Sequence, residues 1–107
     1  MNQHEELIRQ IAKEMAKDRW EDAWDMYYGK EGYPKINKQM HKDIVSFIPS
    51  ARIAVKHMAT MYKYAYFSNY LGTEESEEYQ LWNDNCHYEM EERGLIPPLT
   101  GGEAGER

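Results

Sequence analysis

The sequence predicts an all-α protein, a small helical bundle of three long helices and one short helix with an irregular C-terminal tail. Apolar residues recur in steps of three and four along most of the chain, which is the spacing of one helix face. Glycine and proline fall between these periodic stretches, where helices end. No polar–apolar alternation runs beyond a few residues, so no strand is expected. We expect a helical domain over residues 1–98 and a Gly-rich tail over residues 99–107.

The first long helix is predicted over residues 2–28, where apolar residues recur in steps of four. Gly29 should end it, because glycine adopts the left-handed conformation without steric cost. Residues 29–34 then form a loop. The apolar positions of this helix are Leu7, Ile8, Ile11, Ala12, Met15, Ala16, Trp20, Ala23, Trp24, Tyr27 and Tyr28.

A short helix is predicted over residues 34–48 and a long one over residues 50–71. Pro34 suits a first helical turn, whereas Pro49 disfavours helix at the residue before it. Ser50 can cap the longer helix by accepting a backbone hydrogen bond. The expected buried faces are Ile36, Met40, Ile44, Phe47 and Ile48 on the first, and Ile53, Ala54, Met58, Met61 and Ala65 on the second.

The last helix is predicted over residues 73–93, with Thr73 as its N-terminal cap and acidic residues in its first turn. Gly94 should take a left-handed conformation, with Leu95 folding back on Met90. Two prolines then prevent the helix from continuing. The tail that follows has the composition of a flexible segment, and we expect contact with another surface to order it.

Aromatic residues replace the aliphatic residues that the chain lacks. Leu, Ile, Val and Phe contribute only 16 residues, against nine Tyr, seven Met and three Trp. A core of this size cannot bury nine tyrosine hydroxyls with partners, so some tyrosines should lie at a rim, against a ligand or in a subunit interface. We therefore expect a homo-oligomer. The candidate partner-binding residues are Trp20, Trp24, Leu81 and Tyr88.

The net charge of −6 is unevenly distributed. Residues 30–63 hold seven basic residues against two acidic ones, and residues 73–93 hold eight acidic residues against one basic. Helical spacing places three of the basic side chains within about 40° of one another, beside aromatic rings. This combination favours a phosphate-bearing, nucleotide-like ligand. The candidate ligand-binding residues are Arg52, Lys56, Lys63, Tyr66, Tyr70, Lys38 and Lys42.

The same charges have a structural interpretation, in which the basic residues pair with the acidic last helix while their stems cover apolar surface. On that helix one narrow seam has the spacing of a packed face: Tyr79, Trp82, Cys86 and Met90. Its other side is acidic, with Leu81 and Tyr88 set among the carboxylates as a possible second contact. An acidic helix can also imitate a nucleic-acid backbone, although such a charge run is more often a solvated face.

The chain carries little recognisable catalytic chemistry. Asp84 and His87 have the spacing of half a di-metal bundle site, but neither His41 nor His57 has the acid that would complete it. Cys86 lies on the apolar seam and is interpreted as a small core residue. Phosphate loops, zinc-ligand spacings and nucleophile elbows are missing from the sequence. We therefore expect no enzyme activity, no cofactor, no metal and no sequence-specific binding of duplex DNA.

No basic region followed by an apolar run opens the sequence, and no apolar stretch is long enough to cross a membrane. With its single cysteine, the chain is expected to be cytoplasmic and free of membrane contact. Short helical chains rich in Tyr and Trp resemble small accessory proteins of phages and mobile elements. We expect a non-enzymatic binding protein, either an inhibitor that occupies a protein partner or one that sequesters a phosphate-bearing small ligand. The alternative is a structural or assembly subunit that self-associates through exposed aromatic residues.

Overall fold

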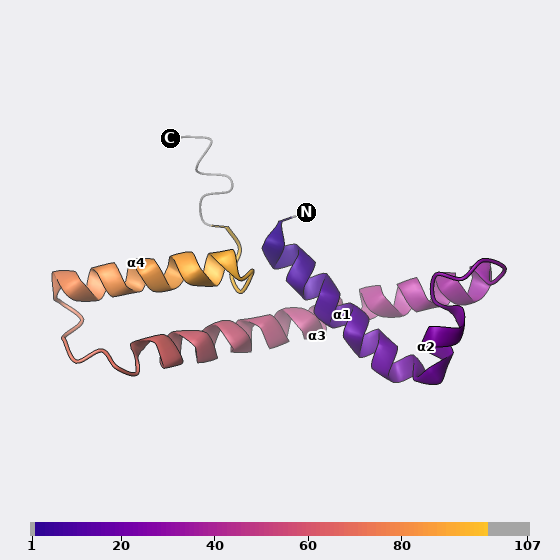
Figure 1. Cartoon of the computed structure of the whole chain (residues 1–107), viewed down its shortest axis with the longest axis horizontal. Coiled ribbons are helices and arrows are strands. Elements are labelled where there is room, and N and C mark those ends of the chain that lie inside the picture. Colours follow the sequence, from indigo (N-terminus) through magenta and orange to yellow (C-terminus); the bar gives the residue numbers. More distant parts are fainter. Residues whose placement is uncertain (1, 99–107) are drawn as a thin grey trace. The chain divides into compact units, whose positions relative to one another are not determined.

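The computed structural model describes residues 2–98 and confirms the all-α prediction (Figure 1). The described residues form no strand. The helices are α1 (Gln3–Trp20), α2 (Asp22–Tyr27), α3 (Pro34–Phe67) and α4 (Glu77–Glu92). Three are long and one is short, as predicted, but the short helix is α2 and not residues 34–48. The predictions for the tail, residues 99–107, lie outside the described residues.

The chain divides into two compact units. The N-terminal unit is Ile8–Ile53, and the C-terminal unit consists of the described residues of Met1–Leu7 and Ala54–Arg107. Both α1 and α3 contribute residues to each unit. The extent of the helical domain, residues 1–98, stays a prediction.

The core of the N-terminal unit confirms the apolar faces predicted for residues 2–28 and 34–48. Buried positions on α1 recur every four residues, and those on α3 are spaced by four and then seven residues, which keeps them on one helix face. A single tryptophan from α2 completes this core. The buried side chains are Ile8, Ala12, Ala16, Trp24, Met40, Ile44 and Ala51.

The helix predicted over residues 2–28 is interrupted at Glu21, so that prediction is wrong at this point. Glu21 has a φ of 53° and a ψ of −131°, a sparsely populated backbone conformation that costs a non-glycine residue about 1–3 kcal/mol. Tertiary contacts on either side hold the break in place. The indole Nε1 of Trp20 donates a hydrogen bond of 2.7 Å to Asp43 Oδ2 on α3, and Trp24 is 5% exposed. The change in chain direction lets both tryptophans reach α3 or the core.

Asn37 closes the connection between α2 and α3. Its side-chain amide donates hydrogen bonds to the carbonyl oxygens of Tyr27 at 2.8 Å and Tyr33 at 2.9 Å. Its Oδ1 accepts a hydrogen bond of 2.7 Å from the backbone N–H of Gly29. Gly29 has a φ of 71°, which confirms it as a left-handed stop.

The predicted boundary at Pro49 is wrong, because α3 runs without interruption through this residue (Figure 1). Ser50 is therefore an interior residue and not a cap. Proline removes the hydrogen bond to the carbonyl of Val45, four residues earlier. Pro49 and Val45 both lie on the exposed side of α3, so water can solvate that carbonyl. Burial of Ile44 on the opposite face outweighs the local preference of proline to end the helix.

In the C-terminal unit, α4 lies alongside the last turns of α3 (Figure 1). A buried cluster of this unit consists of Cys86, Met90 and Leu95, against which Leu7, Ala59, Tyr62, Tyr66, Phe67 and Ile96 pack. Val55 on α3 is also buried, at 1% exposed. The buried face predicted for residues 50–71 is therefore misplaced. Ile53, Met58 and Met61 are 59%, 42% and 69% exposed, and Ala65 is also exposed. Large aromatic rings take the inward positions because they bury more apolar area than methionine or alanine.

The ends of α4 follow two local capping patterns. The helix begins at Glu77, after Ser76, whose hydroxyl accepts a hydrogen bond of 3.0 Å from the backbone N–H of Tyr79. Ser76 therefore replaces the predicted Thr73 as cap. At the other end, Gly94 has a φ of 75°, and Leu95 N–H donates to the Met90 carbonyl at 2.9 Å. This Schellman arrangement confirms the prediction.

Substituting alanine at the two left-handed glycines should give unequal losses. Gly29→Ala should cost the conformational penalty alone, about 1 kcal/mol, because a Cβ atom there meets nothing within 4 Å. Gly94→Ala should cost more, because its Cβ would lie 2.7 Å from the carbonyl oxygen of Gln3. Urea denaturation followed by circular dichroism measures both. Equal losses would contradict the close approach of Gln3 to Gly94.

Candidate ligand-binding site

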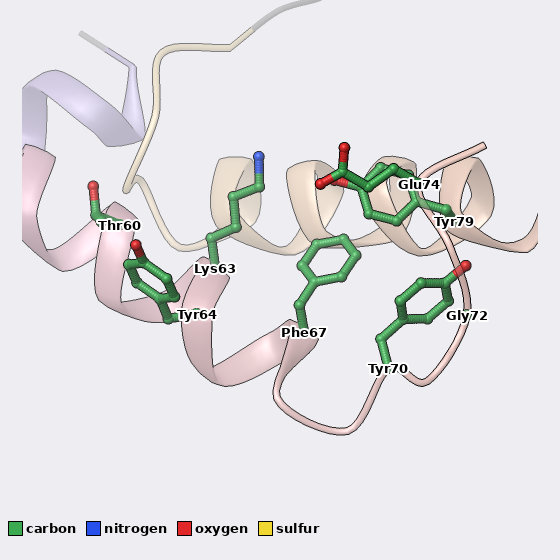
Figure 2. Close-up of a pocket in the computed structure, with 8 residues that line it drawn as sticks. All are labelled: Thr60, Lys63, Tyr64, Phe67, Tyr70, Gly72, Glu74 and Tyr79. Carbon is green, nitrogen blue, oxygen red and sulfur yellow. The ribbon is translucent and has the colours of Figure 1, made fainter. Parts of the chain in front are cut away.

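A hollow of about 500 Å³ lies in the C-terminal unit, where α3 ends and the chain turns back into α4 (Figure 2). We call it the aromatic hollow. Its lining residues come from the last turns of α3, the following loop and the first turn of α4. They are Thr60, Lys63, Tyr64, Phe67, Tyr70, Gly72, Glu74 and Tyr79.

Three lining rings hold one another in place. The centroid of Phe67 lies 5.2 Å from that of Tyr79 and 5.9 Å from that of Tyr70, and the Tyr70 and Tyr79 centroids are 5.5 Å apart. These separations suit edge-to-face and tilted aromatic pairs, each worth about 0.5–1.5 kcal/mol beyond the area it buries. Behind them, Trp82 contacts Phe67 and Tyr70. The hollow therefore has a preorganised aromatic wall.

The loop between α3 and α4 fixes the position of Tyr70. Its hydroxyl donates a hydrogen bond of 3.0 Å to the Thr73 carbonyl and lies 2.5 Å from the hydroxyl of Ser76. Gly72 allows this arrangement, because a Cβ atom at that position would overlap the Tyr70 ring. The same Ser76 hydroxyl caps α4, so the cap and the wall of the hollow share one hydrogen-bonded group.

Two opposite charges enter the hollow. Lys63 and Glu74 both line the hollow, and Figure 2 shows the ammonium of Lys63 extending toward α4. Within residues 2–98, neither group forms a hydrogen bond or an ion pair with another side chain. Both charged groups are thus available to a ligand that reaches the aromatic wall.

Tyr62 does not line the hollow but joins α3 to α4. Its hydroxyl donates a hydrogen bond of 2.6 Å to Glu89 Oε1, and the guanidinium of Arg93 lies 5.2 Å from the centre of its ring. Arg93 also pairs with Glu89 at 3.6 Å. The hydrogen bond to Glu89, with burial, raises the pKa of the Tyr62 hydroxyl above its ordinary value. Burial raises the pKa of Tyr66 in the same direction.

The structure brings together some of the predicted ligand-binding residues. Lys63 and Tyr70 both line the aromatic hollow. Tyr66 is half-buried and does not line the hollow, and its ring centroid lies 5.7 Å from that of Trp82. The other predicted residues do not line the hollow: Lys56 is exposed on α3, and Arg52, Lys38 and Lys42 are exposed on the part of α3 that belongs to the N-terminal unit.

The predicted partner-binding residues fall into two groups. Trp24 is buried and stacks on Tyr28 with ring centroids 4.1 Å apart, and Trp20 is half-buried with its indole bonded to Asp43. Both contribute to the interior of the N-terminal unit. In contrast, Leu81 and Tyr88 are 63% and 64% exposed on the outer face of α4. Of these four residues, only Leu81 and Tyr88 are mostly exposed to solvent.

Sequence reasoning missed Thr60, Tyr64 and Glu74 as lining residues and assigned Tyr79 to packing alone. A usable signal was present on α3, because Thr60, Lys63, Tyr64 and Phe67 have the spacing of one helix face. For Glu74 the sequence offers no such signal, since an irregular loop has no fixed periodicity.

Cys86 is 0% exposed, which confirms its predicted position in the core. Burial raises its pKa above the ordinary value, and the nearby charge of Lys63 opposes this only in part. The thiol is therefore protonated at neutral pH and a poor nucleophile. Among residues 2–98, no three His, Cys, Asp or Glu side chains gather as metal ligands, and Asp84 accepts a hydrogen bond from Gln80.

No helix within the described part of the chain combines the length and the apolar character needed to cross a membrane. The sequence matches no protein-family model, and neither the curated proteins nor the solved structures provide a match.

Tyr62→Phe should lower the free energy of unfolding by about 1 kcal/mol near neutral pH, because it removes the hydrogen bond to Glu89. Because folding raises the pKa of Tyr62, its contribution to the free energy of unfolding is complete below about pH 10. This contribution is lost as pH rises through the folded-state pKa. The variant should therefore show a shallower alkaline loss of stability. Urea denaturation across this pH range measures both effects.

Tyr64→Phe is the matched control, because Tyr64 is 74% exposed and its hydroxyl bonds to no described residue. This variant should match the wild-type protein at every pH. An alkaline stability profile unchanged in Tyr62→Phe would contradict the role of the Glu89 hydrogen bond.

Proposed function

We propose that this protein is a non-enzymatic binding protein that sequesters a small, phosphate-bearing ligand with a planar ring in the aromatic hollow. The observation that carries the proposal is the presence of the Lys63 ammonium beside the ring wall of Phe67, Tyr70 and Tyr79. The volume, about 500 Å³, lies within the range of small-molecule sites in proteins.

The phosphate and the planar ring of such a ligand would bind through different interactions. Lys63 offers three N–H donors and a full positive charge, which suit a phosphate group. An aromatic side chain offers a face on which a nucleobase stacks, an interaction worth about 1–3 kcal/mol per base. Tyr64 is the most exposed of the lining rings, at 74%. Hydrogen bonds to Tyr70 and mutual ring contacts limit the ordering cost of binding.

Isothermal titration calorimetry with purified nucleoside monophosphates at low salt should therefore detect binding. Lys63→Glu should weaken it by about tenfold or more, because a charge-assisted contact is replaced by repulsion. Affinity for the wild-type protein should also fall as salt rises. Thermal melting of the variant checks that the fold is retained.

Lys56→Glu is the matched control, since Lys56 is exposed on the same helix but does not line the hollow. It makes the same charge change about two helical turns earlier and should leave affinity within about twofold. Absence of heat from every nucleotide, or equal losses in the two variants, would contradict ligand capture at Lys63.

Self-association is a second candidate function, favoured by the outer face of α4. Leu81 and Tyr88 are seven residues apart and share one helix face, and each is more than 60% exposed. Apolar side chains ringed by charged ones are a common arrangement at protein interfaces. A structural or assembly subunit could use this pair to bind a second copy.

Sedimentation of the wild-type protein at about micromolar concentration should then show a species heavier than the 12.7 kDa chain. Replacing Leu81 and Tyr88 together by serine should return it to the monomer. A wild-type protein that sediments only as a monomer would remove this candidate and leave ligand capture unaffected.

A further inference from the structure

The carboxylate of Glu74 restricts what the aromatic hollow can hold. Glu74 comes from the loop after α3 and lines the same hollow as Lys63 (Figure 2). An ionised carboxylate accepts hydrogen bonds and donates none. A ligand group beside it must therefore donate hydrogen bonds, because a second anion or a lone pair there would be repelled.

The aromatic wall consists of rings that are inclined to one another. Phe67, Tyr70 and Tyr79 have centroids 5.2–5.9 Å apart and interplanar angles of 36–84°, so they do not form one flat surface. The proposed function places a planar ring against one of these ring faces. The hydrogen-bond donors that Glu74 requires should therefore lie on the edge of that planar ring.

Among the common nucleobases, guanine has the edge that fits a carboxylate best. Its N1–H and N2 amino group donate side by side, one to each oxygen of the carboxylate. Adenine places the N1 lone pair beside its amino group, cytosine places the N3 lone pair there, and uracil flanks its single N–H with two carbonyl oxygens. Each of these three would set at least one acceptor against Glu74.

We propose that the aromatic hollow selects guanine nucleotides, with Glu74 accepting hydrogen bonds from the guanine edge and Lys63 binding the phosphate. This inference rests on the proposed function, since it names the ligand class of the same site. Selectivity follows from the cost of leaving polar groups unpaired. A site built to hydrogen-bond a ligand group rejects analogues that lack it far more strongly than an apolar pocket rejects a missing methylene.

Calorimetric titration with GMP, IMP and AMP tests the assignment, because IMP keeps N1–H but lacks the N2 amino group. The wild-type protein should bind GMP about tenfold or more tightly than AMP, with IMP between them. Glu74→Gln should lower GMP affinity by about tenfold and remove the preference over AMP, because an amide presents one acceptor in place of two.

Glu75→Gln is the matched control, since Glu75 is the exposed neighbour of Glu74 and does not line the hollow. It should keep the wild-type order of affinities. Equal binding of GMP and AMP by the wild-type protein, or a GMP preference that survives Glu74→Gln, would overturn the guanine assignment alone, provided that binding still depends on Lys63. Absence of binding by all three nucleotides would overturn the proposed function together with it.

Discussion

The aromatic packing between the end of α3 and α4 is the interaction on which the C-terminal unit depends. The chain has few large aliphatic residues, and the buried apolar residues described in this unit are Val55, Cys86, Met90 and Leu95. Rings supply the remaining apolar area, and their contacts with Trp82 join the two helices. Because aromatic rings are rigid and have preferred pair geometries, this packing fixes the helices and the intervening loop together.

The same packing creates the candidate site. Phe67 and Tyr79 contribute to the packing between α3 and α4 and also line the aromatic hollow. Substituting either ring would disturb stability and binding at once, so neither can separate the two roles. Lys63 and Glu74 are different, because no described residue pairs with them and their charges face the hollow. For that reason, Lys63 and Glu74 are the residues whose substitution tests ligand binding.

Part of the site could be predicted from sequence, and part could not. The cationic and aromatic character of residues 52–70 indicated Lys63 and Tyr70, and the hollow contains both. Helical spacing predicted Tyr66 on the same exposed face, although the structure packs it against Trp82. That prediction assumed that the strongly apolar residues of the helix are the buried ones. Here tyrosine displaces methionine from the interior, because a ring buries more area and its hydroxyl can still find a partner, as Tyr62 does with Glu89.

The sequence by itself determined the features that depend on local backbone chemistry. Gly29 and Gly94 end their helices in left-handed conformations, because only glycine adopts them without steric cost, and the periodicity identified the all-α class. Tertiary structure alone decided what happens at Glu21 and Pro49. Local preferences favour helix at the first and a break at the second, and both are reversed. Each preference is worth about 1–3 kcal/mol, and burial of several large side chains on the neighbouring turns exceeds it.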